Sequence, residues 1–140
     1  MVDVKDIMLG DFVKDKNGEI VVVGKVHRDS IADKWGGITF DDEIEPIPVT
    51  EEMLKAIGFE DEKGLVSLYQ YWDGSYKYKL NIDEYYTNGD RRWYVQIDNN
   101  TCRSIGCGEF TYLHELQNLV RVITGHNLPI TKDMLPLFRD

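Results

Sequence analysis

The sequence predicts an α+β fold: an N-terminal SH3-like small β-barrel, followed by an antiparallel β-meander that a C-terminal helix covers. Three patterns favour this class. Short β-rich runs separated by turn residues fill the first part of the chain, strand-like runs return after residue 65, and apolar residues recur at helical spacing near the C-terminus. We expect a barrel over 1–49, a helix and linker over 50–64, and a sheet with its helix over 65–140.

The barrel is predicted from a hairpin and two further strand-like runs. Asn17 and Gly18 stand between two β-rich runs, and both residues tolerate positive φ, which is the strongest short-range signal of a hairpin. The runs "GGITF" and "EIEPIPV" follow. Because closing a short meander hides its edge strands, this density of short strands favours a small barrel.

The stretch "PVTEEMLKAIGF" has the features of a short helix. Thr50 is suited to cap its N-terminus, Glu51 and Glu52 complement the positive end of the helix dipole, and Gly58 is suited to end it. The side expected to be buried consists of Met53, Leu54 and Ile57.

A ladder of tyrosines is predicted in the first hairpin of the meander. A two-residue turn at Asp73–Gly74 would pair Tyr71 with Tyr76 and Tyr69 with Tyr78, all on one face. Cross-strand aromatic pairs stabilise a hairpin by roughly 0.2 to 1 kcal/mol each, so packing alone explains them. If uncovered, the same four rings form a platform for sugars, bases or a peptide.

A second hairpin is predicted with its turn at Asn99–Asn100, which places Trp93 opposite Gly106. The Asn88–Gly89 pair is expected to turn the chain between the two hairpins. Cys102 and Cys107 would lie on opposite faces of the last strand, about 16 Å apart, which is too far for a disulfide. We therefore expect two structural thiols.

The stretch "YLHELQNLVRVITGH" predicts an amphipathic helix that begins after Thr111 as N-cap and ends at Gly125. Its apolar stripe consists of Leu113, Leu116, Val120 and Ile123. The opposite side, which we name the polar flank, consists of His114, Gln117, Asn118 and Arg121. The polar flank is interpreted either as an exposed helix side or as a specific contact site.

The sequence contains no recognisable catalytic constellation. A zinc-protease helix needs a second histidine four residues after His114, but that position is Asn118, a poor zinc ligand. There is no Gly-x-Ser-x-Gly elbow and no phosphate-binding loop. We therefore expect no enzymatic activity, no catalytic residue, no metal and no cofactor.

Charge and composition restrict the partners. A net charge of −9 repels phosphate backbones, so nucleic acid is disfavoured and a protein partner is expected. The N-terminal stretch lacks the basic start and apolar run of a signal peptide, and no run approaches the roughly 20 apolar residues that cross a bilayer. These features predict a cytoplasmic protein without a membrane association.

Three stretches carry a resemblance: "LGDFVKDKNGEIVVV", "PIPVTEEMLKAIGFE" and "YLHELQNLVRVITG". Together they resemble a family of proteins of unknown function from Bacteroidetes and their phages and prophages. The most specific element is "HELQN" followed by "TG". The resemblance implies a phage or mobile-element context and carries over no site residue.

Three functions are compatible with these observations. The favoured one is a non-enzymatic interaction or adaptor protein of phage or mobile-element origin that binds through the tyrosine ladder or the polar flank. The second is an acidic inhibitor whose carboxylates imitate the phosphates of nucleic acid against a host enzyme. The third is a metal-dependent hydrolase that uses His114 and Glu115.

Overall fold

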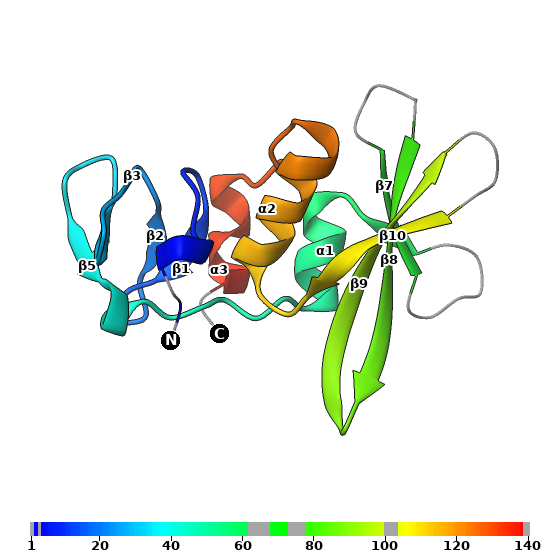
Figure 1. The fold of residues 1–140 in the computed structure, drawn as a ribbon, viewed down its shortest axis with the longest axis horizontal. Coiled ribbons are helices and arrows are strands. Elements are labelled where there is room, and N and C mark those ends of the chain that lie inside the picture. The colour runs from blue at the N-terminus through cyan, green and yellow to red at the C-terminus, as the bar shows by residue number, and fades with distance from the viewer. Residues whose placement is uncertain (1, 3, 62–67, 73–77, 100–103, 139–140) are drawn as a thin grey trace.

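The computed structural model describes residues 2, 4–61, 68–72, 78–99 and 104–138 of the 140-residue chain. Short N-terminal strands lie at one end of the molecule, the helices lie in the middle, and the longer strands lie at the other end (Figure 1). The described residues form an α+β fold with three antiparallel sheets. None of the described helices has the length and apolar character that crossing a bilayer requires.

The N-terminal strands form two separate sheets, which corrects the prediction of a closed SH3-like barrel. One sheet pairs β1 with β2, and the other has the order β3-β4-β5. The elements of this part are η1 Val4–Asp6, β1 Phe12–Lys14, β2 Ile20–Val22, β3 Lys25–Val26, β4 Ser30–Ala32, β5 Ile38–Phe40 and η2 Asp41–Glu43. The predicted hairpin at Asn17–Gly18 is confirmed, with Lys14 opposite Ile20 and Gly18 at a φ of 79°.

The N-terminal strands do not close into a barrel, because the backbone pairs with different strands at two consecutive residues. The backbone N–H of Val23 donates to Asp11 O at 2.9 Å, whereas the N–H of Gly24 donates to Ala32 O at 2.8 Å. In the described part of the chain, β3, β4 and β5 pair only with one another, and the chain returns to β1 only after β5, at the Lys14–Glu45 bridge. Among the described strands, β5 has β4 as its sole neighbour, so its outer edge is not covered by β1.

The helix α1 (Glu51–Ile57) confirms the predicted caps. The Thr50 side chain accepts a hydrogen bond from Met53 N at 3.3 Å, and Gly58 ends the helix at a φ of 126°. The predicted inner side is buried, and it consists of Met53, Leu54 and Ile57.

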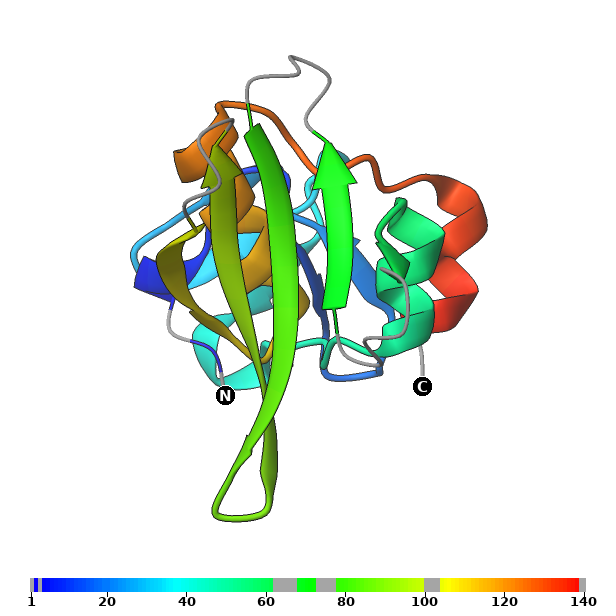
Figure 2. The same cartoon turned by 90° about the vertical axis from the view of Figure 1, so that its right-hand side faces the viewer.

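Five strands form the large sheet in the order β10-β9-β8-β7-β6. Their bounds are β6 Glu60–Asp61, β7 Leu68–Trp72, β8 Tyr78–Thr87, β9 Asp90–Asn99 and β10 Ser104–Phe110. Figure 2 shows the β8–β9 hairpin reaching beyond the rest of the molecule. The predicted turn at its tip is confirmed, because Thr87 pairs with Asp90 and both Asn88 and Gly89 have positive φ.

The register of the predicted tyrosine hairpin is wrong. Tyr71 lies opposite Leu80 and Tyr69 lies opposite Ile82, so the two strands are joined by a longer connection than a two-residue turn. Tyr78 pairs with Asn99 of β9 instead. Tyr76 and the predicted Asp73–Gly74 turn lie outside the described residues.

The register of the second hairpin is also corrected. Trp93 lies opposite Phe110, not Gly106, and their rings stack with centroids 6.4 Å apart. The register shifts between Gly106 and Gly108, so one strand carries an extra residue there. Cys107 occupies this position, while Cys102 and the predicted turn residue Asn100 lie outside the described part of the chain.

The helix α2 (Leu113–Thr124) packs against the sheet, and its C-cap Gly125 has a left-handed φ of 75°. Its N-cap is Tyr112 and not Thr111. The carboxylate of Glu115 accepts from the backbone N–H groups of both residues, which explains why the helix begins there. The chain ends with η3 Lys132–Met134 and α3 Leu135–Phe138.

Two hydrophobic cores support this arrangement. The larger core lies between the helices and the large sheet, with Trp93, Phe59 and Phe138 among its largest buried side chains. The smaller core lies within the N-terminal strands and includes Val13 and Ile31. The polar flank of α2 borders the N-terminal strands, so it lies where the two ends of the fold meet.

Candidate functional site

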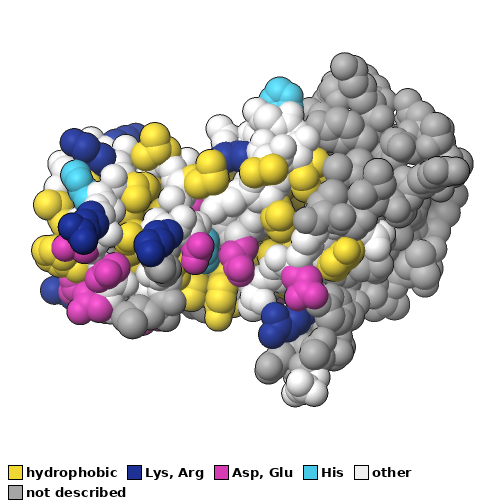
Figure 3. All heavy atoms as spheres, in the orientation of Figure 1, with side chains coloured by type: hydrophobic (Ala, Val, Ile, Leu, Met, Phe, Trp, Pro, Cys, Tyr) yellow, Lys and Arg dark blue, Asp and Glu magenta, His cyan; other side chains and the backbone are white. Residues whose placement is uncertain are grey.

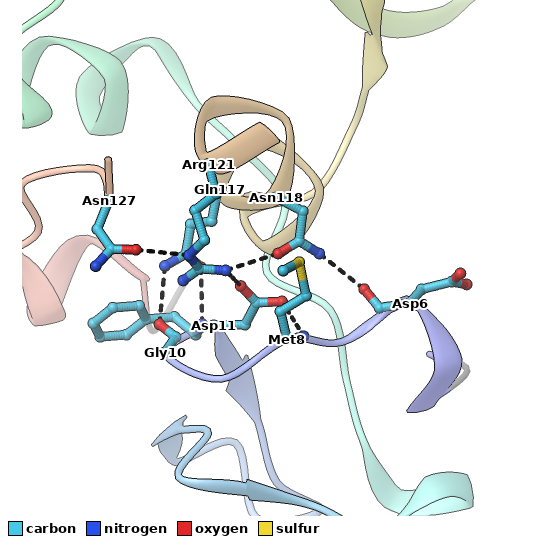
Figure 4. A network of polar contacts seen from close by, with 9 residues as sticks. Asp6, Met8, Gly10, Asp11, Gln117, Asn118, Arg121 and Asn127 are labelled. Carbon is cyan, nitrogen blue, oxygen red and sulfur yellow. Dashed lines mark hydrogen bonds and ion pairs between the residues drawn. The ribbon is translucent and has the colours of Figure 1, made fainter. Parts of the chain in front are cut away.

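Arg121 of the polar flank forms an ion pair with the N-terminal segment, by which we mean residues 6–12. Its Nη1 lies 2.5 Å from Asp11 Oδ1, and the Asp11 side chain is fully buried (Figure 4). The other carboxylate oxygen accepts from Met8 N at 2.9 Å. Gly10 has a φ of 87°, and a Cβ there would lie 3.0 Å from the Arg121 guanidinium. A glycine therefore lets the segment approach the arginine closely.

Two further residues of the polar flank bind backbone groups of the same segment. Gln117 Oε1 accepts from Phe12 N at 2.9 Å, and Gln117 Nε2 donates to Gly10 O at 3.1 Å. Asn118 Nδ2 donates to Asp6 O at 2.9 Å. Each of these bonds joins positions more than a hundred residues apart. The polar flank thus holds the N-terminal segment against α2.

His114 is the fourth member of the polar flank, and it is buried next to Tyr112. Its exposed fraction is 3%, and the two rings are nearly parallel, with centroids 6.2 Å apart. The Nδ1 atom is buried and has no hydrogen-bond partner. Burial lowers the pKa of His114 below its usual 6.5, although the carboxylates of Glu115, Asp11 and Asp6 act in the opposite direction.

This lowered pKa predicts a pH-dependent stability. Below pH 6.5 an unfolded His114 takes up a proton that the folded protein resists, so the free energy of unfolding decreases as the pH falls, by at most about 1.4 kcal/mol per pH unit. The decrease stops below the folded pKa, and none is expected above about pH 7.5. Urea unfolding of the wild type and His114→Gln at pH 7.5, 6.5 and 5.5 measures this. A difference between the two proteins that does not change with pH would contradict the prediction.

The polar flank does not have the geometry of a zinc-hydrolase site. Among the described residues, no group of three or more His, Cys, Asp or Glu side chains could hold a metal ion. Asn118, at the position of the second histidine, is engaged with Asp6 and with Arg121 at 2.8 Å. Glu115 is occupied at the N-terminus of α2.

The tyrosine ladder is only partly within the described chain. In the register of β7 and β8, Tyr69 lies opposite Ile82 and Tyr71 lies opposite Leu80, and these two partners are buried in the larger core. Tyr78 lies at the start of β8, and Tyr76 is outside the described residues. The structure therefore brings together the polar flank, whereas the tyrosine ladder as a set lies partly outside the described residues and stays a prediction.

The β3-β4-β5 sheet carries an exposed apolar surface that was not predicted. In β5 the polar residue, Thr39, faces the protein interior, and its two apolar neighbours face solvent. Thr39 is only 7% exposed, whereas its neighbours Ile38 and Phe40 are 60% and 52% exposed. Trp35, in the turn before β5, is 81% exposed. We name Trp35, Ile38 and Phe40 the apolar face. Ile38 and Phe40 occupy the same side of β5, and exposed large apolar side chains that gather on one surface are typical of interaction sites.

The turn that presents Trp35 is held by Asp33. Its Oδ1 atom accepts from Trp35 N at 2.8 Å and from Gly37 N at 2.9 Å, and the Lys34 ammonium lies 4.5 Å from the Trp35 ring centroid. A Cβ on Gly37 would lie 2.7 Å from the Asp33 carboxylate, so any other residue there would displace the side chain that holds the turn. The indole is therefore presented on an ordered turn.

The sequence contains only an indirect signal for the apolar face. The three residues "ITF" alternate apolar and polar types, which favours a strand with Ile38 and Phe40 facing inward. Tertiary packing places Thr39 opposite the fully buried Ile31 instead. A tryptophan beside two glycines at a turn was the available hint.

Comparison of the chain with protein-family models, with curated proteins and with solved structures finds no match. The resemblance to a Bacteroidetes and phage family therefore stays a prediction, and the evidence for function comes from the geometry described above.

Proposed function

We propose that this chain is a non-enzymatic interaction protein that binds a protein partner through the apolar face. The observation that carries the proposal is the inside-out strand β5, which exposes Ile38 and Phe40 while it buries Thr39. Burying apolar surface stabilises a protein by roughly 25 cal/mol for each Å² removed from water, and these three exposed side chains do not contribute that stabilisation. A partner that covers them recovers this free energy.

The chemistry of the apolar face favours a protein as the partner. Tryptophan and phenylalanine are enriched at the centres of protein interfaces, where a few aromatic side chains contribute most of the affinity. The net charge of −9 opposes nucleic acid. The ordered Asp33 turn lowers the conformational entropy that Trp35 would lose on binding.

Quantitative affinity capture from a lysate of the source organism tests the proposal. The wild-type chain and a Val122→Asp control are expected to recover the same partner, because Val122 is a single exposed apolar residue on α2. Ile38→Asp is expected to lose at least about 90% of it, since one charge at an interface centre costs more than 1.4 kcal/mol.

The proposal fails if the wild type captures no partner, or if Ile38→Asp and Val122→Asp bind the same partner equally. A nucleic-acid enzyme captured equally by both variants would instead favour the acidic-inhibitor function. Both variants are expected to keep the fold, because both positions are exposed and neither belongs to a hydrophobic core. Circular dichroism of each variant verifies this.

A further inference from the structure

A groove lies between the N-terminal segment and the start of α2. Its volume is about 530 Å³, within the usual range of small-molecule sites. The N-terminal segment contributes Asp6 and Met8 to its lining, Glu109 comes from the end of β10, and His114 and Glu115 come from α2. The groove therefore depends on the docking of the segment against the polar flank.

His114 belongs to the lining of this groove, and its buried Nδ1 atom is an unused hydrogen-bonding atom. The residue is more than nine-tenths buried, and its Nδ1 has no partner. Buried polar atoms in proteins nearly always have a partner, and leaving one without it is destabilising. A group bound in the groove can supply the missing partner.

Acidic side chains outnumber basic ones around the groove. Asp6, Glu109 and Glu115 line it together with a single lysine, Lys5. Figure 3 shows acidic side chains following one another between the N-terminal strands and the sheet. Burial favours the neutral form of His114, so the imidazole does not offset this charge. Such a site repels anions and attracts cations.

We infer that the groove beside His114 binds an aliphatic primary ammonium group. A primary ammonium carries three N–H donors and no acceptor, so it matches a neutral imidazole nitrogen and nearby carboxylates. Nδ1 of His114 accepts one N–H, and Asp6 and Glu115 balance the charge. Tyr112 also belongs to the lining of the groove, and its ring adds a cation–π attraction. This site is separate from the apolar face, and each can fail without the other.

Titration of the full chain with butylammonium, followed by NMR, tests this site. Saturable shifts are expected at His114 and Glu115, with a Kd on the order of 10 mM for so small a ligand. Tetramethylammonium has the same charge but no N–H donor, so it is expected to bind at least about five-fold more weakly. Butyrate, an anion of similar size, is expected to cause no saturable shift.

Two variants and two larger ligands complete the test. His114→Leu is expected to abolish binding, and Glu109→Gln, at an exposed position, is expected to weaken it about two- to three-fold. N-acetyl-lysine methylamide and cadaverine distinguish a lysine side chain of a protein from a free diamine, because the tighter ligand identifies the source. The inference is overturned if none of the three amines gives saturable shifts. It is also overturned if butyrate or sodium chloride reproduces the shifts, or if both variants bind like the wild type.

Discussion

Replacing Arg121 with methionine is expected to lower the free energy of unfolding by about 3 to 5 kcal/mol. The substitution keeps most of the aliphatic stem of the side chain but removes the charge that pairs with Asp11. The Asp11 carboxylate is fully buried and, among the described residues, would keep the Met8 N–H as its partner. A buried carboxylate without a counter-charge is strongly destabilising. Urea unfolding followed by far-ultraviolet circular dichroism measures the loss.

A double-mutant cycle shows whether the loss comes from the ion pair. Asp11→Asn combined with Arg121→Met leaves no buried charge, so the double variant is expected to be more stable than the two single losses predict, by roughly 0.5 to 3 kcal/mol. Val122→Ala, next to Arg121 but 79% exposed, is the matched control and is expected to change stability by less than about 0.5 kcal/mol. Additive single losses would contradict the assigned pairing.

Trp93→Ala is expected to cost about 3 to 5 kcal/mol, because it leaves a large cavity in the main core. The indole is 1% exposed and stacks on Phe110 with an interplanar angle of 13°. The same pair defines the corrected register of β9 and β10. Circular dichroism is the appropriate probe, since Trp35 and Trp72 also contribute to the fluorescence.

Arg92→Ala is the matched control for Trp93→Ala, because it lies one position earlier in β9 and points to solvent. Its ion pair with Glu109 is 3.8 Å long and exposed on both sides, so its loss is expected to cost at most about 1 kcal/mol. Equal losses for the two variants would contradict the placement of Trp93 in the core.

Local signals in the sequence predicted the local structure correctly. The Asn88–Gly89 turn and the capped helix α1 depend on backbone conformations that a few adjacent residues determine. The register of β9 and β10 could not be predicted in the same way. It depends on a bulge at Gly106–Gly108, and no residue type in that stretch specifies on which side the extra residue lies.

The candidate site required contacts that no local pattern contains. The spacing of His114, Gln117, Asn118 and Arg121 placed them correctly on one side of a helix, but three of their partners are backbone groups of Asp6, Gly10 and Phe12. A backbone group has no sequence signature, so the distant partner could not be identified. The exposed apolar residues of β5 were missed because the local pattern was misleading. The alternation of Ile38, Thr39 and Phe40 favours a strand with its two apolar side chains buried, whereas the structure exposes them.

Position-specific photo-crosslinking in the source organism tests the central claim, which is that the apolar face binds a protein partner while Gln117, Asn118 and Arg121 hold the N-terminal segment inside the molecule. A photo-reactive amino acid is placed at Ile38 in one variant and at Val122, on α2, in another; both positions are exposed. A discrete protein adduct is expected from position 38 and not from position 122. Adducts from position 122 alone, equal adducts from both, or none from position 38 would contradict the claim.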